Sequence, residues 1–481
     1  MNKDEINENN KENTLINPKD NEENIEQFDT DKIEYTTKEK SIYILKGIGS
    51  ILSSIFHLFG YFSILSLGYT SIYLISFRRH YNQNLNFSYT YCLIPLVSIS
   101  FSLTSPLSGF IKNKFNGKNI IIITDAILCL SFIIMYFSRS IYLDYILMTL
   151  NGFGLAIGFN ITKINAISFF PNKKSLIFGL INLFLNFLSF ILIMYNEVFI
   201  LNNKPEYPSV DKIYYSENVF MNYQNLIIFE ICLLIFTCLF SYLLFFQNNP
   251  KETIKFGFNE KLKEDNNKID ELEKDSKMKN KKNKIKKAIY DKRTIKLIIM
   301  VFLFFPTINL ITNILRMDQH FYFIFGGLYN IVGCLSCLIF GILGDYIQFR
   351  ILFTILSGLL SLTSIFYVIY FDGEFILFLE TILVSLVYNG FNIIFDTHIV
   401  NVYGVDNFVE VWGYIRSSEG ISHIFGIILN CFLEINSPKY KIVYSITCLS
   451  SLISLGIGLF ETEDKFNYDN LNKKLIFIHK M

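Results

Sequence analysis

Residues 109–118 read GFIKNKFNGK, and residues 341–350 read GILGDYIQFR. Each stretch follows the second apolar run in a group of six such runs. Each begins with a glycine and ends with a basic residue, and the first has two further lysines. One such stretch alone would be weak support, but two at equivalent places indicate an internal repeat. The sequence therefore predicts a chain built as two matched halves.

Twelve apolar runs surround these two stretches. A hydrocarbon core about 30 Å thick needs roughly 20 apolar residues as a helix. Lipid holds no water for loose backbone groups, so each run should be helical. The runs span residues 47–74, 90–111, 119–138, 141–162, 174–196 and 223–247, and then 294–315, 320–343, 350–371, 375–399, 411–434 and 440–460. We therefore predict an all-α membrane protein with twelve transmembrane helices in two six-helix bundles.

Charged segments flank and separate the two groups of runs. The first tail is rich in Asn, Lys, Glu and Asp and cannot bury a core, so we expect it to be disordered. The lysine-dense stretch at 277–287 is a solvated linker or, alternatively, a contact with anionic lipid. The predicted segments are a cytoplasmic tail at 1–42, a bundle at 43–247, a charged linker at 248–293, a bundle at 294–461 and a second cytoplasmic tail at 462–481.

Charge distribution predicts the orientation. The net charge is +1, so no overall attraction to nucleic acid follows. Basic residues favour the cytoplasmic side. Lysines at 112, 114, 118, 173 and 174 and those of the linker share one side if both termini are cytoplasmic, while Arg78 and Arg79 lie on the other. We expect a multi-pass monomer in the plasma membrane or an organelle membrane, with the lipid bilayer as its partner.

No sequence pattern indicates catalysis. We find no catalytic triad, metal-ligand cluster or P-loop, so we expect neither enzymatic activity nor a cofactor. Cys334 and Cys337 form a CxxC inside an apolar run without a second pair, which favours small core residues over a metal or redox site. A transporter of this kind would draw its energy from a solute gradient.

The repeated stretch resembles the signature of the major facilitator superfamily, which has a glycine, an acid four residues later, and basic residues at a tight turn. The second copy has Gly341, Leu343, Asp345 and Arg350, and the first has Gly109, Asn113 in place of the acid, Lys114 and Lys118. The resemblance implies that glycine lets neighbouring helices approach closely. It also implies that the acid and the bases form a charge network that holds one face shut.

A narrower resemblance covers two further segments. Residues 151–158 read NGFGLAIG, followed by FFP at 169–171, and residues 403–406 and 412–414 read YGVD and WGY. These are similar to helices 4–5 and 10–11 of the oxalate/formate antiporter and monocarboxylate transporter families. The resemblance implies proton-coupled or exchange transport of small organic anions. Those carriers place basic residues in helices 8 and 11, and here only helix 11 has one, Arg416.

Ionisable groups inside spans are costly and indicate function. Arg416, Glu419 and His423 fall on one face of the predicted eleventh helix, near its cytoplasmic end. Arg416 could hold a carboxylate, and His423 could couple proton movement to transport. Alternatively, Glu419 neutralises Arg416 in a structural network. Asp396 of the tenth helix could pair with Arg416 across the inner mouth.

Other polar residues are candidates to line a central pathway. They are Tyr69 and Tyr73 of the first helix, Asn309, Asn313 and Asn330 of the seventh and eighth, and Tyr388, Asn389, Asn392 and His398 of the tenth. Asparagine can equally join membrane helices. For His57 we favour a structural role, and for Lys163, at the end of the fourth span, snorkelling to the interface.

We therefore predict a secondary transporter of a small organic anion, such as a monocarboxylate, that works by alternating access with H⁺ or by exchange. The alternatives are a carrier for an amino acid, a vitamin or a sugar, a transport-dead receptor or scaffold, and a channel.

Overall fold

A computed structural model shows the fold over residues 37–69, 71–79, 81, 85, 93–201, 217–248, 285, 288–317, 322–369, 374–431 and 439–461. The predicted tails and most of the linker, with its lysine-dense stretch, lie outside the described residues. The chain divides into two units, Met1–Tyr43 and Ile44–Met481. Of the first unit, only the start of one helix is described.

The described residues contain helices and no strand. The first half, here called the N-half, holds α2 (Thr37–Tyr69), α3 (Ser71–Arg79), α4 (Leu93–Lys112), α5 (Gly117–Phe137), α6 (Ile141–Phe169), α7 (Lys174–Leu201) and α8 (Glu217–Leu244). The second, the C-half, holds α11 (Lys292–Met317), α12 (Tyr322–Leu343), α13 (Phe349–Ile369), α14 (Glu374–Tyr403), α15 (Val405–Cys431) and α16 (Lys439–Gly458). With the short α3 counted as an extension of α2, the described chain has six helices in each half, which confirms the predicted fold class.

Two helix boundaries differ from the prediction in ways that matter for the site. α6 continues to Phe169, and α15 begins at Val405 instead of residue 411. Polar residues such as Asn165 and Asp406 end the apolar pattern early, but the helical backbone continues through them. Gly404 alone joins α14 to α15 with φ 81°, a backbone conformation that glycine adopts without strain. Arg416 is therefore about three turns inside its helix, not near its start.

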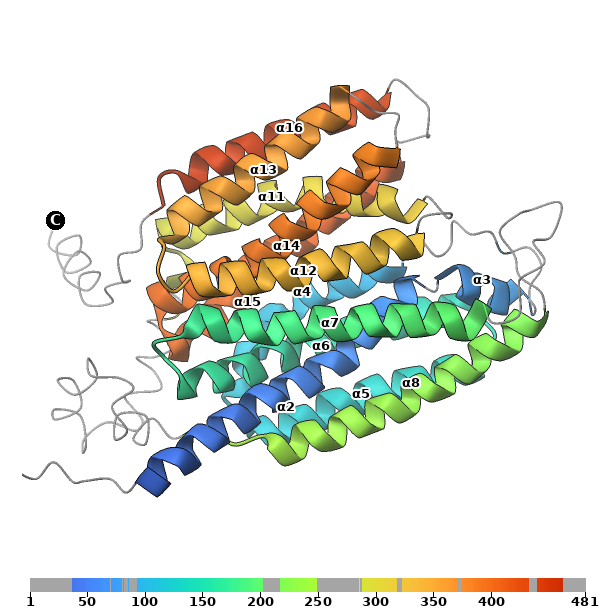
Figure 1. Ribbon diagram of the computed structural model, residues 1–481, viewed down its shortest axis with the longest axis horizontal. Helices are drawn as coiled ribbons and strands as arrows, with labels where there is room; N and C mark the ends of the chain where they lie inside the picture. The colour runs from blue at the N-terminus through green and yellow to red at the C-terminus, as the bar shows by residue number, and fades with distance from the viewer. Residues whose placement is uncertain are drawn as a thin grey trace, which may run out of the picture. The chain divides into compact units, whose positions relative to one another are not determined.

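The two halves meet along two helix pairs. α4 packs against α15, and α7 packs against α12 (Figure 1). Glycine permits both crossings. A Cβ on Gly179 of α7 would lie 2.7 Å from the Gly341 Cα of α12, and a Cβ on Gly413 of α15 would overlap the Ser105 carbonyl oxygen of α4. The backbones therefore touch directly, as small residues permit between membrane helices.

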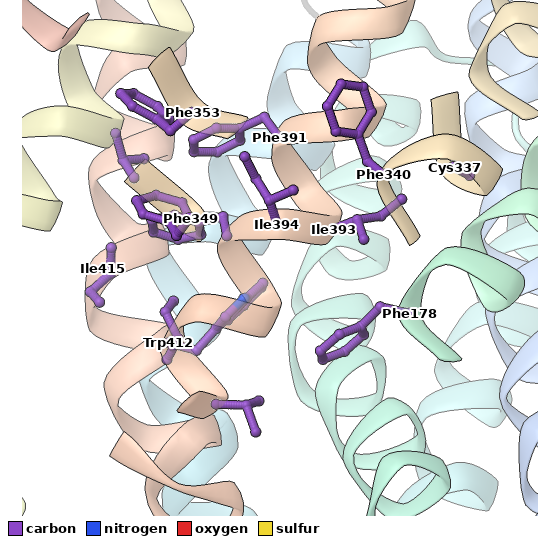
Figure 2. Packing of buried hydrophobic residues seen from close by; sticks show 14 of the residues in the cluster. Phe178, Cys337, Phe340, Phe349, Phe353, Phe391, Ile393, Ile394, Trp412 and Ile415 are labelled. Atoms are coloured by element: carbon purple, nitrogen blue, oxygen red, sulfur yellow. The ribbon is translucent and has the colours of Figure 1, made fainter. Parts of the chain in front are cut away.

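An aromatic cluster makes the core of the C-half rigid. Phe391 of α14 stacks on Phe304 of α11 with ring centroids 4.4 Å apart, and on Phe395 at 5.0 Å. Figure 2 shows Phe391 beside Phe353, with Trp412 further along the same cluster. Such ring pairs stabilise the core beyond the effect of burying apolar area alone. They fix α14 and α15, the helices that carry most of the polar candidates.

A buried ion pair joins α3 to α6 in the N-half. Arg78 of α3 donates to both carboxylate oxygens of Asp144 in α6 at 2.7 Å, and to the carbonyl oxygens of Met135 and Ser138. Both charged side chains are fully buried. Its burial in this network indicates that Arg78 anchors the end of a helix.

The outer surface is apolar. Eight helices of the described chain are long and apolar enough to cross a membrane, among them α5, α6 and α8. Large apolar side chains stay exposed along their outer faces, for example Leu130 at 57% and Phe137 at 74%. So much exposed apolar surface indicates contact with lipid, because soluble monomers rarely show contiguous apolar patches of this extent.

Candidate functional site

Arg416 of α15 lies at the centre of a buried polar cluster. Its Nη1 donates to Glu419 Oε2 at 2.7 Å, its Nη2 donates to Asn392 Oδ1 at 2.5 Å, and Nη2 lies 3.6 Å from Asp396 Oδ1. The guanidinium is also 5.2 Å from the centroid of the Trp412 ring. The arginine is 4% exposed. A cation this deeply buried needs partners of this kind, and three of them are residues expected from the sequence.

Lys163 of α6 joins the same cluster from the N-half. Its Nζ lies 3.9 Å from Asp396 Oδ2, 3.4 Å from Asn182 Oδ1 and 3.8 Å from the centroid of the Phe159 ring. The expectation that Lys163 snorkels to the interface is wrong, because α6 continues beyond it and the side chain is 1% exposed. Its ammonium instead faces the other half.

Asp396 of α14 lies between the two cations. Its carboxylate is within 4 Å of Lys163 and of Arg416, and it accepts a hydrogen bond from Trp412 Nε1 at 2.6 Å. Each carboxylate oxygen therefore lies near a cation from a different half of the protein. Breaking one partner of such a buried network is costly, because it leaves an uncompensated charge.

His423 lies at the edge of the cluster. Its Nε2 is 3.7 Å from Glu419 Oε1, and its side chain is 18% exposed, against 7% for Glu419. Exposure thus increases along α15 from Arg416 to His423. Two basic residues, Lys163 and Arg416, face two acidic residues, Asp396 and Glu419, and His423 lies beside Glu419.

The asparagine candidates separate into two groups. Asn392 binds Arg416, whereas Asn389 accepts a hydrogen bond from Asn186 of α7 at 3.0 Å and so joins the two halves. Asn330 donates to its own helix, at the Gly326 carbonyl oxygen. Tyr388 lies 6.2 Å from Phe305, ring to ring. The side chains of Tyr69, Tyr73, Asn309 and Asn313 lie outside the described residues.

His398 belongs to a different cluster, at the linker end, which is the end of the helices where α8 stops and α11 begins. It stacks on Phe349 at 4.1 Å and lies 3.5 Å from Glu461, which also pairs with Lys296 at 2.9 Å. Burial opposes ionisation of Glu461, but hydrogen bonds from His398 and Lys296 outweigh burial and lower its pKa. The role of this cluster is to fasten α16 to α11 and α14.

The second signature copy closes the linker end between α12 and α7. Asp345 accepts hydrogen bonds from the backbone N–H groups of Ser175 and Leu176, at the start of α7, at 2.9 and 3.2 Å. A carboxylate is stabilised there by the partial positive charge of a helix N-terminus. Partial burial nonetheless raises the pKa of Asp345, against these two hydrogen bonds. Within the described chain no ion pair joins Asp345 to Arg350, which is exposed; Asp345 instead caps α7 and interacts electrostatically with Lys173 and Lys174.

The first copy works differently, because it has Asn113 in place of the acid. Asn113 Nδ2 donates to Glu410 Oε1 of α15 at 3.2 Å, and a Cβ on Gly109 would lie 3.0 Å from the Glu410 Cα. The acid therefore comes from the facing helix. Lys114 and Lys118 lie over the rings of Phe110 and Tyr242, at 4.4 and 5.2 Å.

Sequence reasoning missed several residues of this site. Trp412 donates a hydrogen bond to Asp396, and Asn182 accepts one from Lys163. Glu410 accepts one from Asn113. The sequence did contain a signal for these contacts. Lys163 and Glu410 are charged residues in helical segments, and the first signature copy has Asn113 in place of the acid. Their pairing depends on how the halves meet, which spacing along one helix does not report.

Comparison with known proteins agrees with this geometry. The Major Facilitator Superfamily profile matches residues 14–194. No curated protein sequence matches the chain. Among solved structures, the human organic anion transporter MFSD10 (TETRAN) aligns with a TM-score of 0.59 and 10% identity, covering 86% of this chain and 99% of that one. FucP, the E. coli fucose:proton symporter, aligns in its outward conformation with a TM-score of 0.61 and 12% identity, covering 88% and 100%.

A third similar structure is the proton:xylose symporter XylE, with a TM-score of 0.59 and 11% identity over 86% of this chain and 94% of that one. At such identities the likeness shows the fold, and the substrates of these proteins belong to them alone. Together, the profile, the similar structures and the apolar helices show that this chain is a multi-pass membrane protein with the major facilitator fold.

Proposed function

We propose that this protein is a secondary transporter that moves a small organic anion, of the monocarboxylate kind, together with a proton by alternating access. The observation that carries the proposal is the position of Asp396, whose carboxylate lies between Lys163 of the N-half and Arg416 of the C-half. A substrate carboxylate could bind the same two cations. It would then contact both halves at once, as a carrier with a central site requires.

Charge balance supports proton coupling. The cluster is neutral when Lys163, Arg416, Asp396 and Glu419 are all charged, so an added carboxylate leaves one negative charge in a buried site. A proton taken up at His423 restores neutrality, and His423 is the partly exposed member, 3.7 Å from Glu419. Substrate and proton therefore bind more favourably together than either does alone.

The contacts at the linker end support a conformation closed on that side, which we take to be the cytoplasmic side. Asp345 caps α7, Asn113 binds Glu410, and Lys174 Nζ donates to Asn401 Oδ1 at 2.8 Å. Each of these contacts joins the N-half to the C-half. They must all break when the site opens toward the linker end.

A neutral polar solute is the second candidate. The hydrogen bond between Asn186 and Asn389 joins the halves by amides, which suit hydroxyl groups better than a lone carboxylate. FucP and XylE, whose fold this chain shares, carry sugars with protons. A sugar carrier would tolerate the loss of Arg416 far better than an anion carrier.

Counterflow in proteoliposomes tests the proposal. The purified protein is loaded with a panel of monocarboxylates and sugars, and exchange of the labelled solute is measured. We expect monocarboxylate counterflow that falls about 100-fold in Arg416→Ala, because loss of a buried charge contact costs about 3 kcal/mol. Arg416→Lys keeps the charge and should retain part of the rate. Sugar counterflow that survives Arg416→Ala would overturn the anion assignment in favour of the second candidate.

A further inference from the structure

A second buried acid–base pair lies inside the N-half, away from Arg416. His57 Nδ1 of α2 is 2.9 Å from Asp125 Oδ1 of α5, and the two side chains are 0% and 5% exposed. The pair is tightly enclosed, because a Cβ on Gly158 of α6 would overlap the imidazole. A proton that binds here is shared between two groups whose charges depend on each other.

Few other titratable groups face this pair. Cys129 of α5 and Cys238 of α8 interact electrostatically with Asp125, and both are thiols without disulfide partners. α6 packs against the imidazole at Gly158, while Lys163, further along α6, lies near Asp396 in the other half. Within the described part of the chain, the ion pair given for Asp125 is the one with His57.

A row of buried hydroxyl groups lies between the pair and the linker end, and Ser50 and Ser53 donate to backbone carbonyl oxygens of Phe246 and Ser241. Ser50, Ser53 and His57 lie at i, i+3 and i+7, on one face of α2. Ser53 Oγ donates to the Ser241 carbonyl oxygen of α8 at 2.7 Å, and Ser50 Oγ receives a hydrogen bond from Asn165 Nδ2 at 3.3 Å. Asn165 is partly exposed, whereas the serines are buried. Polar groups thus run from the linker end toward His57, one turn apart.

We propose that the His57–Asp125 pair is a proton-binding site, reached from the linker end along this row of hydroxyl groups. The imidazole gains the proton at a ring nitrogen and becomes imidazolium beside the carboxylate, and it releases the proton to the same side. The site is separate from the Arg416 cluster. That the bound proton drives transport rests on the proposed function, whereas proton binding itself does not.

Histidine NMR tests proton binding directly. The full chain, labelled with ¹⁵N in its six histidine rings, is placed in lipid nanodiscs, and the spectrum of His57→Gln identifies the His57 signals. Spectra are recorded between about pH 5 and pH 9, and we expect the His57 nitrogen signals to shift as the ring gains a proton. The pH dependence should change in Asp125→Asn, which removes the neighbouring carboxylate. His57 signals that stay constant over this range overturn the proposal, because a purely structural pair keeps one protonation state.

Transport measurements test the coupling. The probe is whichever labelled monocarboxylate of the panel shows counterflow with the unmodified protein. We expect Asp125→Asn to retain counterflow, which needs no net proton transfer, and to lower accumulation driven by a pH gradient, because the proton bound at His57 is lost while the one proposed at His423 remains. His398→Asn, which removes a buried histidine of the other half, is the matched control and should retain both.

Gradient-driven accumulation by Asp125→Asn equal to that of the unmodified protein would overturn the coupling role. If no member of the panel shows counterflow even in the unmodified protein, the proposed function fails, and the NMR titration still decides whether the pair binds a proton.

Discussion

Asp396 is the single residue on which the two cations of the site converge. Lys163 and Arg416 approach different oxygens of its carboxylate, at 3.9 and 3.6 Å, from different halves of the chain. If a substrate carboxylate uses the same cations, Asp396 competes with it in the closed conformation. A carboxylate supplied from solution should then replace Asp396 when that side chain is removed.

Chemical rescue of Asp396→Ala checks this competition. The substitution leaves two buried cations with one counter-charge fewer, and we expect it to lower the free energy of unfolding by about 3–5 kcal/mol. Formate, which is small enough to fill the space of the removed carboxylate, should recover a large part of the lost thermal stability. The measurement is the unfolding temperature in detergent with formate or with chloride at equal ionic strength. Asp345→Ala is the control, and an equal response to formate in both variants would contradict the competition.

The lowered pKa of Glu461 predicts how the stability of the protein depends on pH. Its pKa is lowered in the folded protein, so its stabilising contribution is complete above its ordinary pKa and is lost as the pH falls through the lower, folded value. We expect Glu461→Gln to reduce the unfolding temperature at neutral pH. The difference from the unmodified protein should narrow below about pH 4.5. A difference that stays constant down to acid pH would show that Glu461 acts by packing and not by charge.

Spacing along one helix predicted some residues of the site and not others. Arg416, Glu419 and His423 could be grouped from the sequence because i, i+3 and i+7 positions share a helix face wherever the helix lies. Lys163 could not be assigned to them, because its partner Asp396 is more than two hundred positions away in the chain. His57 likewise shows its partner, Asp125, only when α2 and α5 are packed together.

At the scale of helices, hydropathy predicted their number but misplaced ends at which polar residues continue a helix. α15 begins six residues before the predicted start, through a stretch that contains Asp406 and Glu410. Close helix crossings were better predicted. The glycine of the second signature copy, Gly341, does contact a neighbouring backbone, and its partner is another glycine, Gly179.

The α7–α12 crossing therefore predicts different effects for different glycines. A Cβ on Gly341 would lie 3.0 Å from the Gly179 Cα, whereas a Cβ on Gly358 of α13 has nothing within 4 Å. We expect Gly341→Ala to destabilise the protein by about 1–3 kcal/mol through overpacking. Gly358→Ala should be neutral or stabilising by up to about 1 kcal/mol, because alanine favours helix. Unfolding temperatures of the two variants are the measurement, and equal effects would contradict a close crossing.

At the scale of the whole molecule, the contacts between the halves at the linker end determine whether transport is possible. Asn113, which directly follows α4, and Glu410 of α15 contact each other at 3.2 Å. Alternating access requires this contact to open in every cycle, because the N-half and the C-half must separate on this side. A covalent link at this point should hold the protein closed.

Cross-linking tests whether the contact between Asn113 and Glu410 must open during transport. In a chain whose eight cysteines are replaced, Asn113→Cys and Glu410→Cys are joined by a short bifunctional thiol reagent, and counterflow is measured before and after linking. We expect linking to abolish counterflow, and a cleavable reagent to restore it on cleavage. Lys296→Cys with Glu461→Cys is the control, since these side chains contact each other at 2.9 Å within the C-half alone. Linking that second pair should leave most of the counterflow, because rigid rotation of a half does not change distances inside it. Undiminished counterflow with the first pair fully linked would mean that the halves do not separate at the linker end, and substrate would then have to pass by a route other than the one between them.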